Sequence, residues 1–157
     1  MKKSAAATAA IIIVLCLALD RAVKMWTVAN LDLGMSRPFL PGFIELQRLH
    51  NYGAAWSSFS GMRWVLVGLT SVVIVVLIVL LVRGIVKHMF GVAALALIIA
   101  GGFGNLVDRA ALGYVVDMFQ FQFWTTFPIF NVADMAIVAG GIMAVVYYLF
   151  LHDKAGK

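Results

Sequence analysis

Residues 64–82 read WVLVGLTSVVIVVLIVLLV, nineteen consecutive residues without a single charge. As an α-helix this run is about 28 Å long, close to the ~30 Å thickness of a bilayer's hydrocarbon core. A second uncharged run occupies residues 89–107, and the apolar run 128–151 is interrupted by one acid, Asp134. A shorter uncharged run, 4–19, can continue through Asp20 to about residue 26. The sequence therefore predicts four transmembrane helices, with approximate bounds 4–26, 64–82, 89–107 and 128–151.

The composition supports a membrane protein over a soluble one. Of 157 residues, 64% are hydrophobic and only 12% are charged, against the roughly 25% charged residues of soluble domains. The net charge of +5 comes from basic residues placed in ones and twos at the ends of apolar runs. Such placement is typical of membrane anchors and argues against nucleic-acid binding. We predict that residues 1–157 form a single integral membrane domain.

The distribution of basic residues predicts the orientation. Each side of the membrane receives six Lys or Arg side chains, but one set lies in short tails and in the tight 83–88 loop. Because the positive-inside rule applies to short flanks, we place both termini and that loop in the cytoplasm. Two long loops, 27–63 and 108–127, then lie outside.

The outer loops carry signals of regular structure. Residues 119–123 read FQFQF, an alternation typical of a strand, and residues 43–50 partly alternate after a Pro-Gly turn. Residues 57–63 suggest a short helix on the membrane surface. The predicted fold is an all-α membrane protein, a four-transmembrane-helix bundle with a small extracytoplasmic β-sheet and a short interfacial helix.

Two acids lie in apolar surroundings without a cation nearby in sequence, Asp117 and Asp134. If both reached one outer pocket they would share a proton, which suits water activation. Alternatively, Asp134 could cap or hydrogen-bond within the bundle while Asp117 is solvated. Intramembrane acids also serve transport, so the residues alone leave catalysis and proton-coupled transport both open.

Other polar residues gather at the predicted outer ends of the helices. Asp20 and Lys24 are four residues apart, a spacing that suits an ion pair on one helical face. Asn105 and Arg109 likewise share a face, with Asp108 beside them, whereas Asn51 could be an ordinary turn residue. The three histidines are far apart in sequence and lack His-x-x-x-His spacing, so no zinc site is predicted.

Five blocks of the chain, in order, resemble the lipoprotein signal peptidase family, also called signal peptidase II. They are Asp20-x-x-x-Lys24, residues 51–56 (NYGAAW), residues 102–109 (GFGNLVDR), residues 116–119 (VDMF) and residues 130–134 (FNVAD). The resemblance runs nearly end to end.

This resemblance implies an aspartyl endopeptidase of the bacterial inner membrane. It would act on diacylglyceryl-modified prolipoproteins and cut just before the lipid-bearing cysteine, near the outer face of the membrane. Asp117 and Asp134 would form the catalytic dyad. The other residues carried over would bind the substrate backbone or support the dyad: Asn51, Asn105, Arg109 and Asn131, with Asp20 and Lys24 from the first helix and Asp108 near Arg109.

The resemblance further implies a protein that needs no metal or organic cofactor and that is inhibited by globomycin-type cyclic peptides. The sequence gives no sign of oligomerisation, so we expect a monomer shielded by membrane lipids. The rival hypothesis is a small proton-coupled transporter. Transporters commonly have repeated halves or broken helices in corresponding positions, and we see neither pattern in the sequence.

Overall fold

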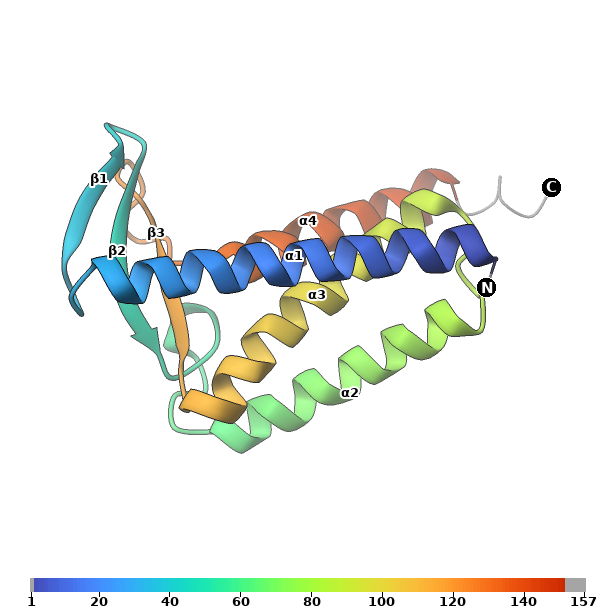
Figure 1. Cartoon of the computed structure of the whole chain (residues 1–157), viewed down its shortest axis with the longest axis horizontal. Helices are drawn as coiled ribbons and strands as arrows, with labels where there is room; N and C mark the ends of the chain where they lie inside the picture. The colour runs from blue at the N-terminus through green and yellow to red at the C-terminus, as the bar shows by residue number, and fades with distance from the viewer. Residues whose placement is uncertain (1, 152–157) are drawn as a thin grey trace.

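The structure is a computed structural model that describes residues 2–151, and it contains four long helices with a small sheet at one end (Figure 1). The helices are α1 (Lys3–Asn30), α2 (Arg63–Val82), α3 (Met89–Leu112) and α4 (Val132–Val146), which continues as a π-helical segment η2 (Tyr147–Leu151). All four are long and apolar enough to cross a membrane once η2 is included. The four predicted spans are therefore confirmed. Lys154 and Lys157, two of the basic residues in the short tails from which the orientation is predicted, lie outside the described residues.

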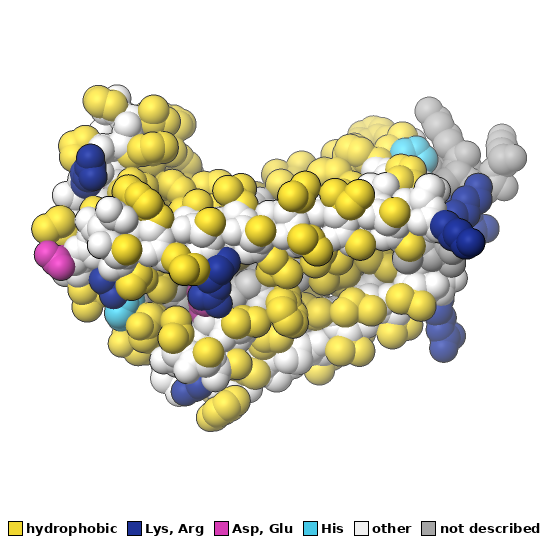
Figure 2. Space-filling view, viewed as in Figure 1, with side chains coloured by type: hydrophobic (Ala, Val, Ile, Leu, Met, Phe, Trp, Pro, Cys, Tyr) yellow, Lys and Arg dark blue, Asp and Glu magenta, His cyan; other side chains and the backbone are white. Residues whose placement is uncertain are grey.

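Helix α3 is the centre of the bundle, because it packs against each of the other three helices (Figure 1). Small residues allow the close approach: a Cβ added at Gly140 of α4 would lie 2.7 Å from the carbonyl oxygen of Ala94 on α3. Packing through small residues is usual between helices in lipid, where apolar burial alone gives little drive for association. Apolar side chains cover much of the outer surface of the bundle, and Lys and Arg side chains lie toward its two ends (Figure 2).

The sheet has three antiparallel strands in the order β1-β2-β3. They are β1 (Ser36–Leu40), β2 (Ile44–Asn51) and β3 (Val115–Phe121). The two predicted strand regions are confirmed, although β3 begins four residues before the FQFQF stretch and ends at Phe121. Strand β1 was not predicted, because all five of its residues are exposed and it shows no burial alternation.

Four other boundaries differ from the prediction by more than one residue. Helix α1 continues beyond residue 26 to Asn30. The short helix is a single 3-10 turn at Ala55–Ser57, not a helix over residues 57–63, because left-handed backbone at Phe59 (φ 56°) and Gly61 (φ 82°) interrupts any helix there. Helix α3 continues beyond residue 107 to Leu112, where Gly113 adopts the left-handed conformation that ends helices. Helix α4 begins at Val132, not at residue 128, because Asn131 caps it.

Candidate active site

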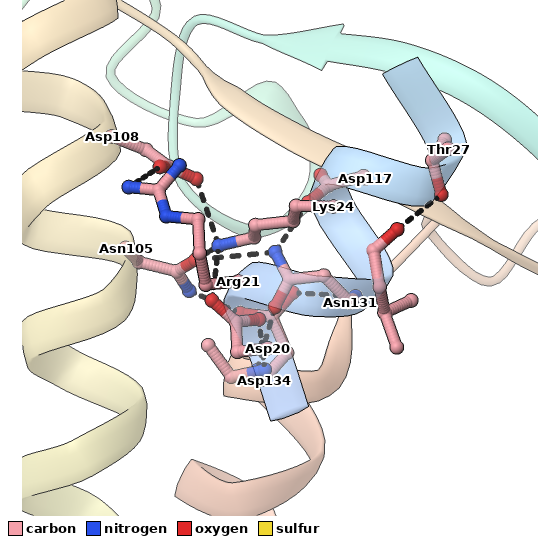
Figure 3. Close-up of polar contacts among 11 residues, drawn as sticks. Asp20, Arg21, Lys24, Thr27, Asn105, Asp108, Asp117, Asn131 and Asp134 are labelled. Carbon is pink, nitrogen blue, oxygen red and sulfur yellow. Dashed lines mark hydrogen bonds and ion pairs between the residues drawn. The ribbon is translucent and has the colours of Figure 1, made fainter. Parts of the chain in front are cut away.

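Nine polar residues from five elements converge where the bundle meets the sheet, and Figure 3 labels seven of them, all except Asn51 and Arg109. They are the nine site residues predicted from the sequence: Asp20 and Lys24 on α1, Asn51 on β2, Asn105, Asp108 and Arg109 on α3, Asp117 on β3, and Asn131 and Asp134 at the start of α4. Residues separated by more than a hundred positions touch here, since Asp20 Oδ1 accepts a 2.9 Å hydrogen bond from the backbone N–H of Ala133.

Asp134 lies in the first turn of α4 and forms a capping box with Asn131. The Asp134 N–H donates to Asn131 Oδ1 at 2.9 Å, and the Asn131 N–H donates to Asp134 Oδ2 at 3.1 Å. The other carboxylate oxygen, Oδ1, accepts a 2.8 Å hydrogen bond from Asn105 Nδ2. A helix N-terminus favours negative charge through its unpaired N–H groups. Asp134 is therefore the N3 acid of the capping box, so it hydrogen-bonds within the bundle, which is one of the alternatives left open by the sequence.

Asp117, by contrast, is not solvated: it is 1% exposed. Its two oxygens accept hydrogen bonds from side-chain amides, Oδ2 from Asn51 Nδ2 at 2.9 Å and Oδ1 from Asn131 Nδ2 at 2.6 Å. Burial and the nearby charge of Asp134 raise the pKa of Asp117 to about 7, although its hydrogen bonds and Lys24 act in the opposite direction. Asn131 contacts both acids and so fixes them relative to each other.

Lys24 is buried and 2% exposed, yet it contacts neither acid of the pair directly. Its Nζ lies 2.8 Å from Asp20 Oδ2 and 2.8 Å from Asp108 Oδ2, which confirms the ion pair predicted for Asp20 and Lys24. Nζ also donates to Asn105 Oδ1 at 3.0 Å. Because an ammonium group only donates, it forces the oxygen of Asn105 toward itself and the NH₂ toward Asp134. Lys24 thus orients a ligand of the acid pair.

Asp108 and Arg109 have different hydrogen-bond and ion-pair partners. Asp108 contacts Lys24 and Arg21 of α1, and Arg21 Nη2 is 3.4 Å from Asp108 Oδ1. Arg109 instead donates from Nη2 to the carbonyl oxygen of Gly53 at 2.6 Å, which ties α3 to the loop after β2. Arg21 was not predicted as a site residue, although it directly follows Asp20 in the sequence.

A cavity of about 610 Å³ opens beside the acid pair. Asp117, Asp134, Asn51, Asn105 and Arg109 contribute its polar wall, and the rest is largely apolar and aromatic: Trp56, Val115, Phe121, Phe127, Phe130, Met135 and Val138 are among the lining residues. The sequence did not predict that aromatic side chains line the site, because the FQFQF alternation indicated only a strand. A mostly apolar cavity with a few convergent polar groups is typical of a ligand site.

The donor set does not resemble a metal site. Within residues 2–151, no three His, Cys, Asp or Glu side chains are placed to hold a metal ion. Each oxygen of the two acids instead accepts from an amide or a backbone N–H. Two buried carboxylates that differ in environment can hold one proton between them, so that one accepts a proton while the other donates one.

Comparisons with known proteins agree on one family. The family model described as signal peptidase (SPase) II matches residues 12–150. The chain is 43% identical over 143 residues to the lipoprotein signal peptidase of Enterococcus faecalis, covering 91% of this chain and 88% of the relative. It is 42% identical over 147 residues to that of Lactococcus lactis subsp. cremoris, covering 94% and 95%.

Two solved structures of bacterial membrane enzymes have the same fold. A bacterial membrane enzyme solved at 2.3 Å resolution superposes with a TM-score of 0.86 at 30% identity, covering 96% of this chain and 92% of that one. A second, solved at 1.9 Å, superposes with a TM-score of 0.84 at 29% identity, covering 92% and 94%.

Proposed function

This chain belongs to the signal peptidase II family, whose members remove signal peptides from prolipoproteins, and we propose that it does so as an aspartic endopeptidase with Asp117 and Asp134 as its catalytic pair. The observation that carries the proposal is the single cavity that both acids line, with Asn131 bonded to each of them. The family does not favour the rival transporter hypothesis.

We assign the resting proton of the pair to Asp117 and the negative charge to Asp134. Asp134 accepts a backbone N–H at a helix N-terminus, where a carboxylate is stabilised. Asp117 lies on a strand, is almost fully buried, and has a pKa raised to about 7 by burial and by the charge of Asp134. The pair therefore holds one general base and one general acid at neutral pH.

The reaction then follows with balanced protons. Asp134 takes a proton from a water molecule, whose oxygen attacks the scissile carbonyl carbon, and Asp117 donates its proton to the carbonyl oxygen. The resulting tetrahedral diol collapses when the diol returns a proton to Asp117 and Asp134 protonates the departing amine. The carbon–nitrogen bond breaks, a carboxyl group forms on the signal peptide, and the pair regains its starting protonation.

Asn51, Asn105 and Asn131 hold the two acids in this geometry. Each points an NH₂ group at a carboxylate oxygen: Asn51 and Asn131 at Asp117, and Asn105 at Asp134. Lys24, with Asp20 and Asp108, supports them through Asn105. Arg109 lines the cavity and already binds one backbone carbonyl, that of Gly53, so it is suited to contact the substrate backbone as well.

The form of the cavity fits a lipid-modified substrate cut just before its lipidated cysteine. Its apolar part includes Met135 and Val138 of α4, and Val138 is 61% exposed on the outer surface of the bundle. A diacylglyceryl group can therefore stay in the bilayer while the adjoining peptide bond reaches the acids. An extended substrate segment would lie beneath the aromatic side chains of β3 and of the loop that follows it.

We propose an inner-membrane location with both termini in the cytoplasm and the acid pair near the outer face. In support, α1 begins and α4 ends at the bundle end opposite the sheet (Figure 1). The test uses a Cys16→Ala background, where Cys16 is the single cysteine. In intact cells a membrane-impermeant maleimide should label Ser36→Cys on β1 and leave Lys87→Cys unlabelled. The reverse pattern would contradict the orientation.

The reaction is tested with purified chain in proteoliposomes and a precursor prepared with and without its diacylglyceryl group. We expect cleavage of the lipidated precursor alone, with a product mass that begins at the lipidated cysteine, and inhibition by globomycin. Equal cleavage of both precursors would contradict the substrate assignment, and a product mass beginning elsewhere would contradict the cut site. A monomer is expected by light scattering with detergent mass subtracted.

A further inference from the structure

A second groove, of about 520 Å³, lies between the outer end of α1 and the sheet, apart from the acid pair. Trp26 and Thr27 of α1 form one wall, and Arg37, Leu46 and Phe119 are on the other. Arg37 is paired with Leu46 across β1 and β2, and Leu46 is paired with Phe119 across β2 and β3. Directly paired residues project from the same face of a sheet, so the three strands present one row of side chains toward the helix.

The groove lies at the level of the lipid headgroups. Helix α1 has 28 residues and is thus about 42 Å long, whereas the hydrocarbon core is only ~30 Å thick. The excess of about 12 Å lets its last turns extend into the headgroup layer. Trp26 is in those turns and is 44% exposed, as expected for a side chain of the interfacial aromatic belt.

Arg37 differs from the other arginines near this end of the molecule. Each of those binds a protein oxygen: Arg21 pairs with Asp108, Arg48 donates to the carbonyls of Val28 and Leu31, Arg63 to that of Ala110, and Arg109 to that of Gly53. Within residues 2–151, the Arg37 guanidinium has no hydrogen-bond acceptor and no carboxylate partner. An exposed guanidinium that no protein oxygen engages, in a groove walled by apolar side chains, is complementary to a phosphate that carries acyl chains.

We propose that this groove binds a membrane phospholipid, with its phosphate on Arg37, its glycerol region against Trp26 and an acyl chain descending along α1. The occupant carries a phosphate, which distinguishes it from the diacylglyceryl group of a prolipoprotein. The bound lipid ties β1 to the membrane surface. Strand β1 is an edge strand of the sheet, and all five of its residues are exposed.

The test measures lipid binding without any substrate, so it is independent of the proposed peptidase activity. The purified full chain in detergent micelles is titrated with phosphatidylglycerol, and retained lipid is counted by native mass spectrometry. Arg37→Gln is compared with Arg37→Lys, which keeps the charge, and with Arg83→Gln, an exposed arginine beside the turn after α2. We expect Arg37→Gln to weaken retention of one lipid by about tenfold, the effect of losing a charge-assisted bond, with wild-type retention in Arg83→Gln and intermediate retention in Arg37→Lys.

Two further ligands identify what is bound. Diacylglycerol with the same acyl chains should bind at least about tenfold more weakly than phosphatidylglycerol, because it lacks the phosphate. Soluble glycerol phosphate should not displace the lipid at equal concentration, because it lacks the chains. Unchanged retention in Arg37→Gln, equal retention of diacylglycerol, or displacement by glycerol phosphate would each overturn the proposal.

Discussion

Replacing Lys24 by methionine tests how the acid pair is supported. The Lys24 ammonium is 2.8 Å from Asp20 and 2.8 Å from Asp108, and the side chains of these two acids are 5% and 1% exposed. Methionine keeps the apolar stem but leaves two buried carboxylates without their main counter-charge. Removing one partner of a buried pair costs about 3–5 kcal/mol, so we expect the unfolding equilibrium constant of Lys24→Met to rise by roughly 10²–10³-fold or more.

The assay is reversible unfolding in mixed micelles, with Lys87→Met as the matched control because Lys87 is exposed. Adding Asp108→Asn to Lys24→Met removes one stranded charge, so the double variant should recover about 1–3 kcal/mol. A loss below about 1 kcal/mol in Lys24→Met, or no recovery in the double variant, would refute the idea that these groups form a charged, buried network.

Three further outcomes are expected. Because Asp117 must be protonated to act as the acid and its pKa is raised to about 7, kcat/KM should fall as the pH rises above about 7. A kcat/KM that stays unchanged up to pH 9 would contradict this assignment. Gly140→Ala should destabilise the bundle by about 1–3 kcal/mol, because its Cβ would lie 2.7 Å from the Ala94 carbonyl, whereas Gly141→Ala meets nothing within 4 Å and should unfold like the wild type. Asn105→Ala should lower kcat about 10²-fold with a smaller change in KM, because the substitution removes the hydrogen bond that holds Asp134 and removes no substrate contact. An effect confined to KM would instead indicate that Asn105 binds the substrate.

The helices could be predicted because membrane spans follow from length and the absence of charge alone. The uncharged run 64–82 corresponds to α2, which begins only one residue earlier, at Arg63. The start of α4 was misplaced because residues 128–130 (PIF) are as apolar as the helix, and only the Asn131 cap separates them from it. Strand β1 lacked a signal because a fully exposed edge strand has no face to bury.

Asp117 and Asp134 could be identified in the sequence as two carboxylates without a neutralising neighbour. Their positions relative to each other could not be predicted, because these depend on how β3 packs against α4. Phe119 and Phe130 exchange backbone hydrogen bonds, which brings β3 to the start of that helix. No local pattern predicts that bridge. For the same reason the sequence could pair Asp20 with Lys24, four residues apart, whereas the contacts of Lys24 with Asn105 and Asp108 depend on how α1 packs against α3.

The most direct test of the central claim is the cleavage rate of lipidated precursor by Asp117→Asn and Asp134→Asn, with Asp32→Asn as control. Asp32 is an exposed acid in the loop between α1 and β1. Each of the three variants is first shown to be folded, by an unfolding transition in mixed micelles like that of the wild type. We predict that each dyad variant loses about 10²–10⁴-fold or more in kcat, while Asp32→Asn cleaves at the wild-type rate. Cleavage within tenfold of wild type by either dyad variant would contradict the account.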